Sequence, residues 1–221
     1  MTMDRTPNRG FHPPQASGRR QIAAAILAAT ALVLLSFLVP RGRMPPAGAA
    51  AAPAGSLYVL DATWTDQSGR TLTLEQLAGR PRVVAMGYTH CTYACPRIVA
   101  QLKRIEAAFQ DAGAERAPGL VLVSIDPARD TPGRLAEFAD GMRLDPARWT
   151  LLTGSDDAVL DLSVLLDVKY RAEAGGDFAH SNALTVLDAR GAVAARVEGL
   201  NGDLEPAIEV LTDLLDEGAR P

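Results

Sequence analysis

RVVAMGYTHCTYACPRIVAQ, residues 82–101, contains both cysteines of this 221-residue chain, Cys91 and Cys95. Residues 82–88 have the apolar pattern of a buried strand, and residues 96–111 have the spacing of a helix with one apolar face. If the helix begins near Cys91, both sulfurs can face one object, because side chains four residues apart share a helix face. A helix N-terminus also lowers thiol pKa values and favours the thiolate, which binds metals and attacks disulfides.

The composition is that of one globular domain preceded by a non-globular part. Hydrophobic residues make up 48% of the chain and charged residues 22%, close to a globular average. The net charge of −4 offers no basic footprint for nucleic acid, which is therefore excluded as a partner. Residues 57–221 remain for a single domain of ordinary size.

The N-terminal part divides into three predicted segments. Residues 1–21 are polar and rich in Pro, Gly and Arg, which predicts a disordered cytoplasmic segment. Residues 22–39 carry no charge and would span about 27 Å as a helix, which predicts a transmembrane anchor. Residues 40–56 are a Pro/Ala/Gly linker.

The charges around the apolar run predict its orientation. Four arginines precede it and two follow it, so the positive-inside rule favours a cytoplasmic N-terminus. The chain is then a single-pass inner-membrane protein whose globular domain lies on the periplasmic side. The alternative is a cleaved signal peptide, because residues 47–49 have the small-x-small form of a cleavage site. That site lies well beyond the apolar run, which favours the uncleaved anchor.

From residue 57 onward, strand patterns and helix patterns alternate. The predicted strands are 57–60, 71–74, 82–88, 119–125, 149–152, 183–187 and 192–197, and the predicted helices are 96–111, 132–142, 155–166 and 203–215. This order predicts an α/β fold with a central sheet flanked by helices on both faces. Asp126 and Asp130 are interpreted as a turn residue and a helix cap, not as metal ligands.

The cysteine pair has three interpretations. A structural disulfide between residues four apart would close a very small loop and contribute little stability. Thiol–disulfide exchange would use one low-pKa cysteine to attack a client and the other to resolve the intermediate. A metal site would need further ligands, and two thiolates with an imidazole suit Cu(I), whereas zinc normally takes a fourth protein ligand. The availability of a histidine therefore discriminates between them.

The chain has three histidines. His12 lies in the predicted cytoplasmic segment and is set aside. His90 precedes Cys91, and its side chain is expected to point away from that of its neighbour. His180 is predicted to lie in a loop immediately before the strand 183–187, where a lone histidine is more often a surface group than a ligand.

Three blocks in order resemble the Sco/SenC family. Residues 87–96, Gly-Tyr-Thr-His-Cys-Thr-Tyr-Ala-Cys-Pro, resemble its copper motif, Cys-x-x-x-Cys-Pro after a strand. Residues 124–132 resemble its second block, and residues 178–181 with the strand that follows resemble its third. The resemblance covers about residues 57–215 and implies a thioredoxin-like fold.

The resemblance also implies a function and a ligand set. Carried over by position, Cys91, Cys95 and His180 would hold one copper ion, as Cu(I) or Cu(II). Members of the family deliver copper to the CuA centre of cytochrome c oxidase subunit II, or prepare its thiols. The implied protein is a membrane-tethered copper chaperone without catalytic turnover, whose partners are subunit II or another copper client and other copper carriers.

The alternative is a thiol-disulfide oxidoreductase that reduces client cysteines with Cys91 and Cys95. Oxidoreductases of the thioredoxin superfamily carry a cis-proline in the loop that faces the active site. Residues 177–183, the corresponding segment, contain no proline and offer His180 instead, which favours metal.

The chain departs from the family pattern at two places. Many members have Pro-Asp after the first cysteine, where this chain has Thr92-Tyr93. Many have Asp before the histidine, where this chain has Ala179. Loss of that carboxylate removes a possible hydrogen-bond partner of a ligand, so copper affinity, redox state or the client can differ.

Overall fold

The computed structural model describes residues 55–114 and 116–218. The predicted disordered segment, the predicted anchor and nearly all of the predicted linker lie outside these residues. In the described part, no helix has both the length and the apolar character needed to cross a bilayer.

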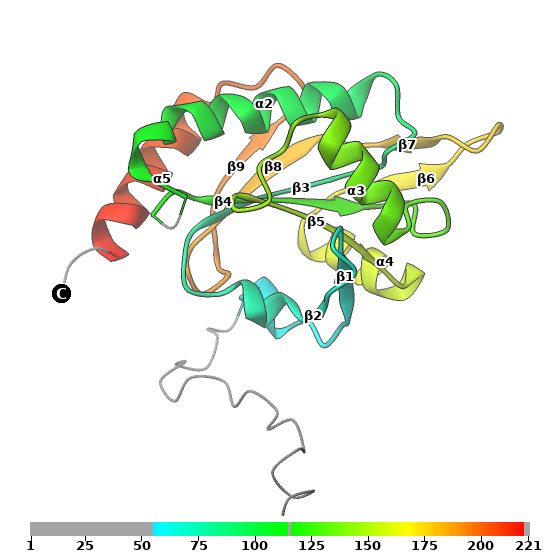
Figure 1. Cartoon of the computed structure of the whole chain (residues 1–221), viewed down its shortest axis with the longest axis horizontal. Helices are drawn as coiled ribbons and strands as arrows, with labels where there is room; N and C mark the ends of the chain where they lie inside the picture. Colours follow the sequence, from blue (N-terminus) through cyan, green and yellow to red (C-terminus); the bar gives the residue numbers. More distant parts are fainter. Residues whose placement is uncertain (1–54, 115, 219–221) are drawn as a thin grey trace, which may run out of the picture. The chain divides into compact units, whose positions relative to one another are not determined.

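A seven-stranded mixed sheet organises the domain, in the order β2-β1-β5-β4-β3-β8-β9 (Figure 1). A separate two-stranded sheet pairs β6 with β7. The strands are β1 (Trp64–Asp66), β2 (Thr71–Leu72), β3 (Arg82–Gly87), β4 (Gly119–Ser124), β5 (Trp149–Gly154), β6 (Tyr170–Ala172), β7 (Phe178–His180), β8 (Ala183–Leu187) and β9 (Val193–Glu198). The helices are α2 (Ala94–Ala108), α3 (Pro132–Gly141), α4 (Asp156–Leu165) and α5 (Glu205–Gly218), with short 3-10 turns η1 (Leu57–Val59), η2 (Leu74–Leu77) and η3 (Gln110–Ala112).

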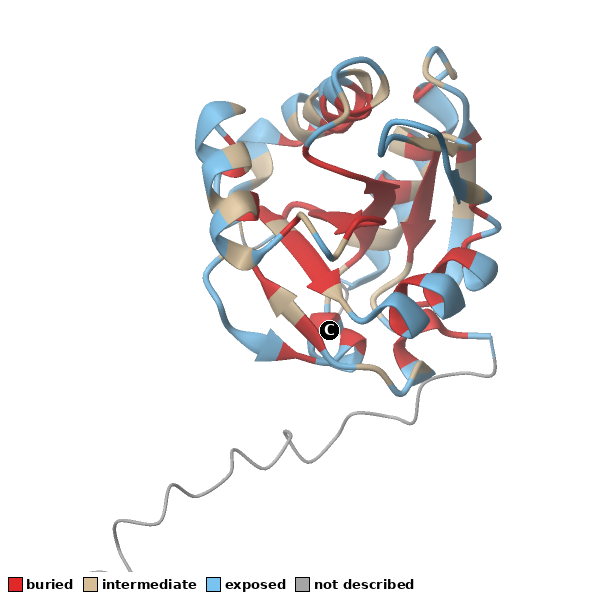
Figure 2. Cartoon of the chain, turned by 90° about the vertical axis from the view of Figure 1, so that its right-hand side faces the viewer, coloured by how far each residue is buried: buried red, intermediate tan, exposed pale blue. Residues whose placement is uncertain are grey.

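Both faces of the sheet are covered, as the α/β pattern predicts. Every residue of β3 and of β4 is buried, which is expected of strands with a layer on each side. Successive side chains alternate between two cores: Val83 and Ala85 pack with residues of α2, α3 and α5, and Val84 and Met86 pack with residues of α4, η1 and η2. Figure 2 shows the buried central strands between helices whose outer faces are exposed.

The prediction of a strand at residues 57–60 is wrong. This segment forms η1, whose first turn is capped by the Ser56 hydroxyl as it accepts a hydrogen bond from the Tyr58 N–H. The strand that pairs with β2 is β1 instead. It escapes sequence analysis because it is three residues long and ends in aspartate, which is depleted in strands. Asp66 stands there because its carboxylate accepts the N–H groups of Ser68 and Arg70 and so holds the turn to β2.

The hairpin of β6 and β7 is also missed by sequence analysis. Its strands are three residues each, and their register pairs Tyr170 with His180. The connection passes through Gly175 and Gly176, both at positive φ, where glycine avoids the steric cost that other residues bear. The Gly-Gly pair between two short segments is the signal that could have indicated a hairpin. His180 is therefore the last residue of a strand and not a loop residue.

One edge of the sheet collects the residues of interest. β3 and β4 run parallel and end side by side, with Gly87 opposite Ser124. The loops that leave both strands therefore start at the same edge. β8 runs antiparallel to β3, with Leu184 opposite Ala85, so the chain that enters β8, including His180, arrives at this edge too.

Candidate metal centre

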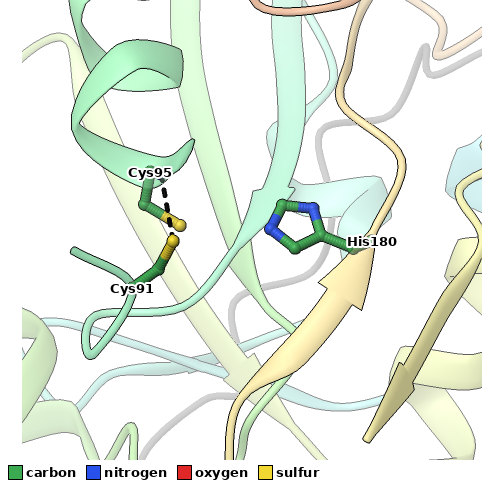
Figure 3. A group of neighbouring side chains, drawn as sticks. All are labelled: Cys91, Cys95 and His180. Atoms are coloured by element: carbon green, nitrogen blue, oxygen red, sulfur yellow. Dashed lines mark hydrogen bonds between the residues drawn. The ribbon is translucent and has the colours of Figure 1, made fainter. Parts of the chain in front are cut away.

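The structure brings together the two cysteines and one histidine. The sulfurs of Cys91 and Cys95 and a ring nitrogen of His180 all lie within 4.8 Å of one another. Cys91 comes from the loop after β3, Cys95 from the first turn of α2 and His180 from the end of β7 (Figure 3). His90 does not belong to this group of donor atoms.

Cys91 precedes the helix instead of lying on it, because α2 begins at Ala94 and Tyr93 is its N-cap residue. The Cys91 sulfur accepts hydrogen bonds from the backbone N–H groups of Ala94, at 3.3 Å, and Cys95, at 3.4 Å. Partial burial raises the pKa of this thiol, but the hydrogen bonds that it accepts at the helix start outweigh burial and bring its pKa below the ordinary value. Cys91 is thus a half-buried sulfur disposed to be a thiolate.

Cys95 differs from its partner in burial and in acidity. Its side chain is fully buried, and its sulfur accepts a hydrogen bond from the backbone N–H of Tyr88 at 3.2 Å. Burial raises its pKa well above the ordinary value of a thiol. Both cysteines are free thiols. The pair therefore combines a half-buried thiol of lowered pKa, Cys91, with a fully buried thiol of raised pKa, Cys95. A metal ion that binds Cys95 as a thiolate would have to displace its proton.

Gly87 makes room for the buried sulfur, so we expect Gly87→Ala to disturb the centre. A Cβ at this position would lie 2.8 Å from the Cys95 sulfur, closer than two such atoms can approach without displacement. We expect a loss of about 1–3 kcal/mol in the free energy of unfolding, as for other overpacked cores, measured by denaturant titration.

The matched control is Gly133→Ala in α3, where an added Cβ meets no atom within 4 Å. That variant should be neutral, or more stable by up to about 1 kcal/mol, because alanine favours helix. Equal destabilisation of the two variants would contradict the role given to Gly87.

His180 presents one nitrogen as a free acceptor. Its Nδ1 lies 3.1 Å from the backbone carbonyl of Ser181, and because a carbonyl only accepts, Nδ1 carries the proton. Nε2 then keeps its lone pair, and this atom is buried without a hydrogen-bond partner among the described residues. Burial also lowers the pKa of His180, which favours the neutral imidazole. A neutral imidazole with an unused lone pair beside two sulfurs fits a soft metal ion such as Cu(I).

Tyr88 and Arg129 hold the hairpin that carries His180. The Tyr88 hydroxyl accepts a hydrogen bond from the Phe178 N–H at 3.3 Å, and its ring lies 5.5 Å from the Phe178 ring and 6.0 Å from the imidazole. Arg129 donates to the carbonyl of Gly176 and lies 6.0 Å from the Phe178 ring. Sequence analysis does not identify these two positioning residues, because neither has a local pattern that indicates contact with a segment so distant along the chain.

A second group of potential donors lies nearby, formed by His90, Asp126 and Asp130 within 4.8 Å of one another. The side chain of His90 is 42% exposed, and its Nδ1 lies 3.7 Å from Asp130. The Asp126 carboxylate accepts a hydrogen bond from Arg129, and its backbone carbonyl accepts the N–H groups of Arg129 and Asp130, which forms the predicted turn. The group is therefore interpreted as a hydrogen-bond network.

Asp130 is not the helix cap that the sequence predicts. The cap is Thr131, whose hydroxyl accepts the Arg134 N–H. Asp130 is fully buried and accepts hydrogen bonds from the Thr89 N–H at 3.0 Å, the Thr89 hydroxyl at 2.6 Å and the Ser124 hydroxyl at 2.6 Å. It ties the loop that leads to Cys91 to the end of β4.

Comparison with known proteins identifies the family of this chain. The SCO1/SenC family profile matches residues 52–216. A protein of Stutzerimonas stutzeri whose name describes it as copper-binding is 29% identical over 136 residues, which are 60% of this chain and 65% of that protein's length.

Two solved structures show that the fold is shared. ScoI of Arabidopsis thaliana, solved with copper bound, has a TM-score of 0.59 at 21% identity and covers 71% of this chain and 94% of its own. BsSco, a member of the Sco family of cytochrome c oxidase assembly proteins in which a disulfide switch was identified, has a TM-score of 0.61 at 21% identity and covers 70% of this chain and 91% of its own.

The fold is therefore the thioredoxin-like α/β fold that the sequence resemblance implies, with helices on both faces of a mixed sheet. The profile match covers the whole described sheet and all three residues of the candidate centre. This chain belongs to the SCO1/SenC family.

Proposed function

We propose that this protein is a copper chaperone that receives one copper ion at Cys91, Cys95 and His180 and passes it to a client. The proposed client is the CuA site of cytochrome c oxidase subunit II. Residues 22–39 are proposed to anchor the chain in the inner membrane, with the globular domain on the periplasmic side. Their uncharged run supports the anchor, and the copper-bound relative supports the cargo.

The unpartnered Nε2 of His180 is the observation that carries the proposal. A buried polar atom without a partner is costly, and a ring nitrogen of His180 lies within 4.8 Å of both sulfurs. A bound copper ion would satisfy it. Because Cys91 is the more accessible of the two sulfurs, an incoming client ligand can replace that bond first, and the ion leaves by ligand exchange without any turnover of substrate.

The test is an anaerobic Cu(I) titration of the purified full chain against a competing chelator. We expect one equivalent of Cu(I) to bind, and His180→Ala to lower the affinity by at least about tenfold, since changes of groups beyond the ligands already cost 10–100-fold. His90→Ala is the matched control and should bind as the wild type does. Weak binding that does not change in His180→Ala would refute the proposed centre.

Copper affinity should decrease as the pH falls, with a steeper slope at low pH than near neutral pH. Cys95, whose pKa is raised, is protonated at neutral pH, so copper must displace its proton and the affinity should change about tenfold per pH unit. Below the lowered pKa of Cys91, a second proton competes and the slope should approach about a hundredfold per unit. Titrations between about pH 5.5 and 8.5 measure this slope. Cys91→Ser should lack the steep lower part, and a flat profile of the wild type would contradict thiolate ligation.

A second candidate function, reduction of client disulfides, is supported by the asymmetry of the thiols. Cys91 is accessible with a lowered pKa, and Cys95 is buried with a raised one, as in an attacking and a resolving cysteine. A reductase should keep its activity in His180→Ala and lose it in Cys91→Ala. A chaperone should lose copper in both variants.

A further inference from the structure

An aromatic ring and a guanidinium contact each other at the start of α2, within two residues of the cysteines of the candidate metal centre. Tyr93 lies between the two cysteines in sequence and is 68% exposed, although tyrosine is usually at least partly buried. Arg97 follows one helical turn later on α2, on the same helix face. Its Cζ lies 5.4 Å from the centre of the Tyr93 ring, and it donates a hydrogen bond to the Tyr93 hydroxyl at 3.1 Å.

A second segment of the chain holds Arg97 from the other side. Its guanidinium donates to the side-chain oxygen of Asn201 at 2.7 Å. One turn farther along α2, Gln101 donates to the backbone carbonyl of Gly199, so the loop that precedes α5 packs along this face of the helix. The guanidinium is thus oriented before any partner arrives. Two of its five N–H donors are used by these bonds, and the others remain for a ligand.

In the part of the chain that the structure describes, Arg97 has no charged partner. By contrast, Arg129, Arg134 and Arg171 each pair with a carboxylate close by in sequence. Among the described residues, no carboxylate lies within ion-pair distance of Arg97. The chain as a whole has a net charge of −4. Within the described structure, Arg97 is therefore an oriented cation without a counter-ion, two residues from Cys95, in an acidic protein.

We propose that Tyr93 and Arg97 form a docking pair for a carboxylate on the protein that exchanges copper with this chain. The partner surface around the receiving ligands is then acidic. Tyrosine and arginine are enriched among residues that dominate binding energy, and a guanidinium recognises a carboxylate through two parallel hydrogen bonds. The inference rests on the proposed function and names the chemistry of its partner.

The first experiment measures Cu(I) transfer from the loaded full chain to the purified copper domain of subunit II. Arg97→Glu should lower the second-order rate about tenfold, because charges at an interface act mainly on the association rate. Tyr93→Ala should lower it about threefold. The wild-type rate should fall with added salt more steeply than that of Arg97→Glu.

Arg104→Glu is the matched control. Arg104 is exposed on α2, whereas Arg97 is half-buried. Arg104 lies seven residues later on nearly the same face, about 10 Å farther along the axis. The Arg104→Glu variant has the same change of charge as Arg97→Glu and should transfer copper at the wild-type rate. Equal effects of the two substitutions would overturn the docking pair and indicate net charge alone.

A second arm does not depend on the identity of the client. Transfer to bicinchoninate, which carries carboxylates, is compared with transfer to neocuproine, which is neutral. Arg97→Glu should slow the first about fivefold and leave the second unchanged. Unchanged transfer to both the acidic chelator and the protein would overturn the proposal. A wild-type chain that binds no Cu(I) would refute the proposed function, and the docking pair would fall with it, whereas normal binding with unaltered transfer refutes the docking pair alone.

Discussion

Cys95→Ser should lower the Cu(I) affinity of the chain by at least about a hundredfold, the largest effect that we expect from a single substitution. The serine hydroxyl nearly matches the thiol in shape and can accept the Tyr88 N–H as the sulfur does. It is, however, a hard ligand that Cu(I) disfavours. The fold should therefore persist while the metal is lost. Competition titration with a Cu(I) chelator measures the loss.

Thermal unfolding of the same variant is the control. Because both cysteines are free thiols in the structure, neither Cys95→Ser nor a reductant should shift the midpoint of the metal-free chain by more than a few degrees, the equivalent of about 1 kcal/mol. A large drop with reductant would instead support a structural disulfide. Affinity that stays at the wild-type value in Cys95→Ser would remove this sulfur from the centre.

Asp130→Ala should destabilise the domain by about 3 kcal/mol, the second large effect. The substitution leaves the Thr89 N–H and the Ser124 hydroxyl without their buried acceptor, and each unsatisfied buried group costs about 1–3 kcal/mol. For a chain of this size the midpoint of thermal unfolding should fall by roughly 6–12 °C. Copper affinity should fall as well, because the loop from Thr89 leads directly to Cys91.

Two further variants test whether the loss of stability comes from removing the buried Asp130 carboxylate. Asp130→Asn keeps the shape and one acceptor oxygen, so its loss of stability should be smaller. Asp161→Ala removes an exposed carboxylate from α4 and should change the free energy of unfolding by no more than about 0.5 kcal/mol. A drop in Asp130→Ala no larger than that of Asp161→Ala would show that the buried network does not stabilise the fold.

The residue pattern alone was sufficient for the α/β architecture. Strands such as β3 and β4 are continuous apolar runs, and α2 carries its apolar residues at helical spacing. The conformation of each of these segments can therefore be predicted from its own residues. The junction of β3 and α2 also placed the cysteine pair at a helix start. The short elements were not predicted, because β1, β6 and β7 have three residues each, too few for a periodic signal.

Only the tertiary structure brings the three residues of the candidate metal centre together. His180 lies 85 residues after Cys95, and it arrives beside the sulfurs only because β8 runs antiparallel to β3 and begins where β3 ends. Asp130 resembles a helix cap in sequence, but the fold buries it against Thr89 and Ser124. Local periodicity reports whether a residue faces a core. It carries no information about which distant segment lies across from that residue, because that depends on strand order and direction.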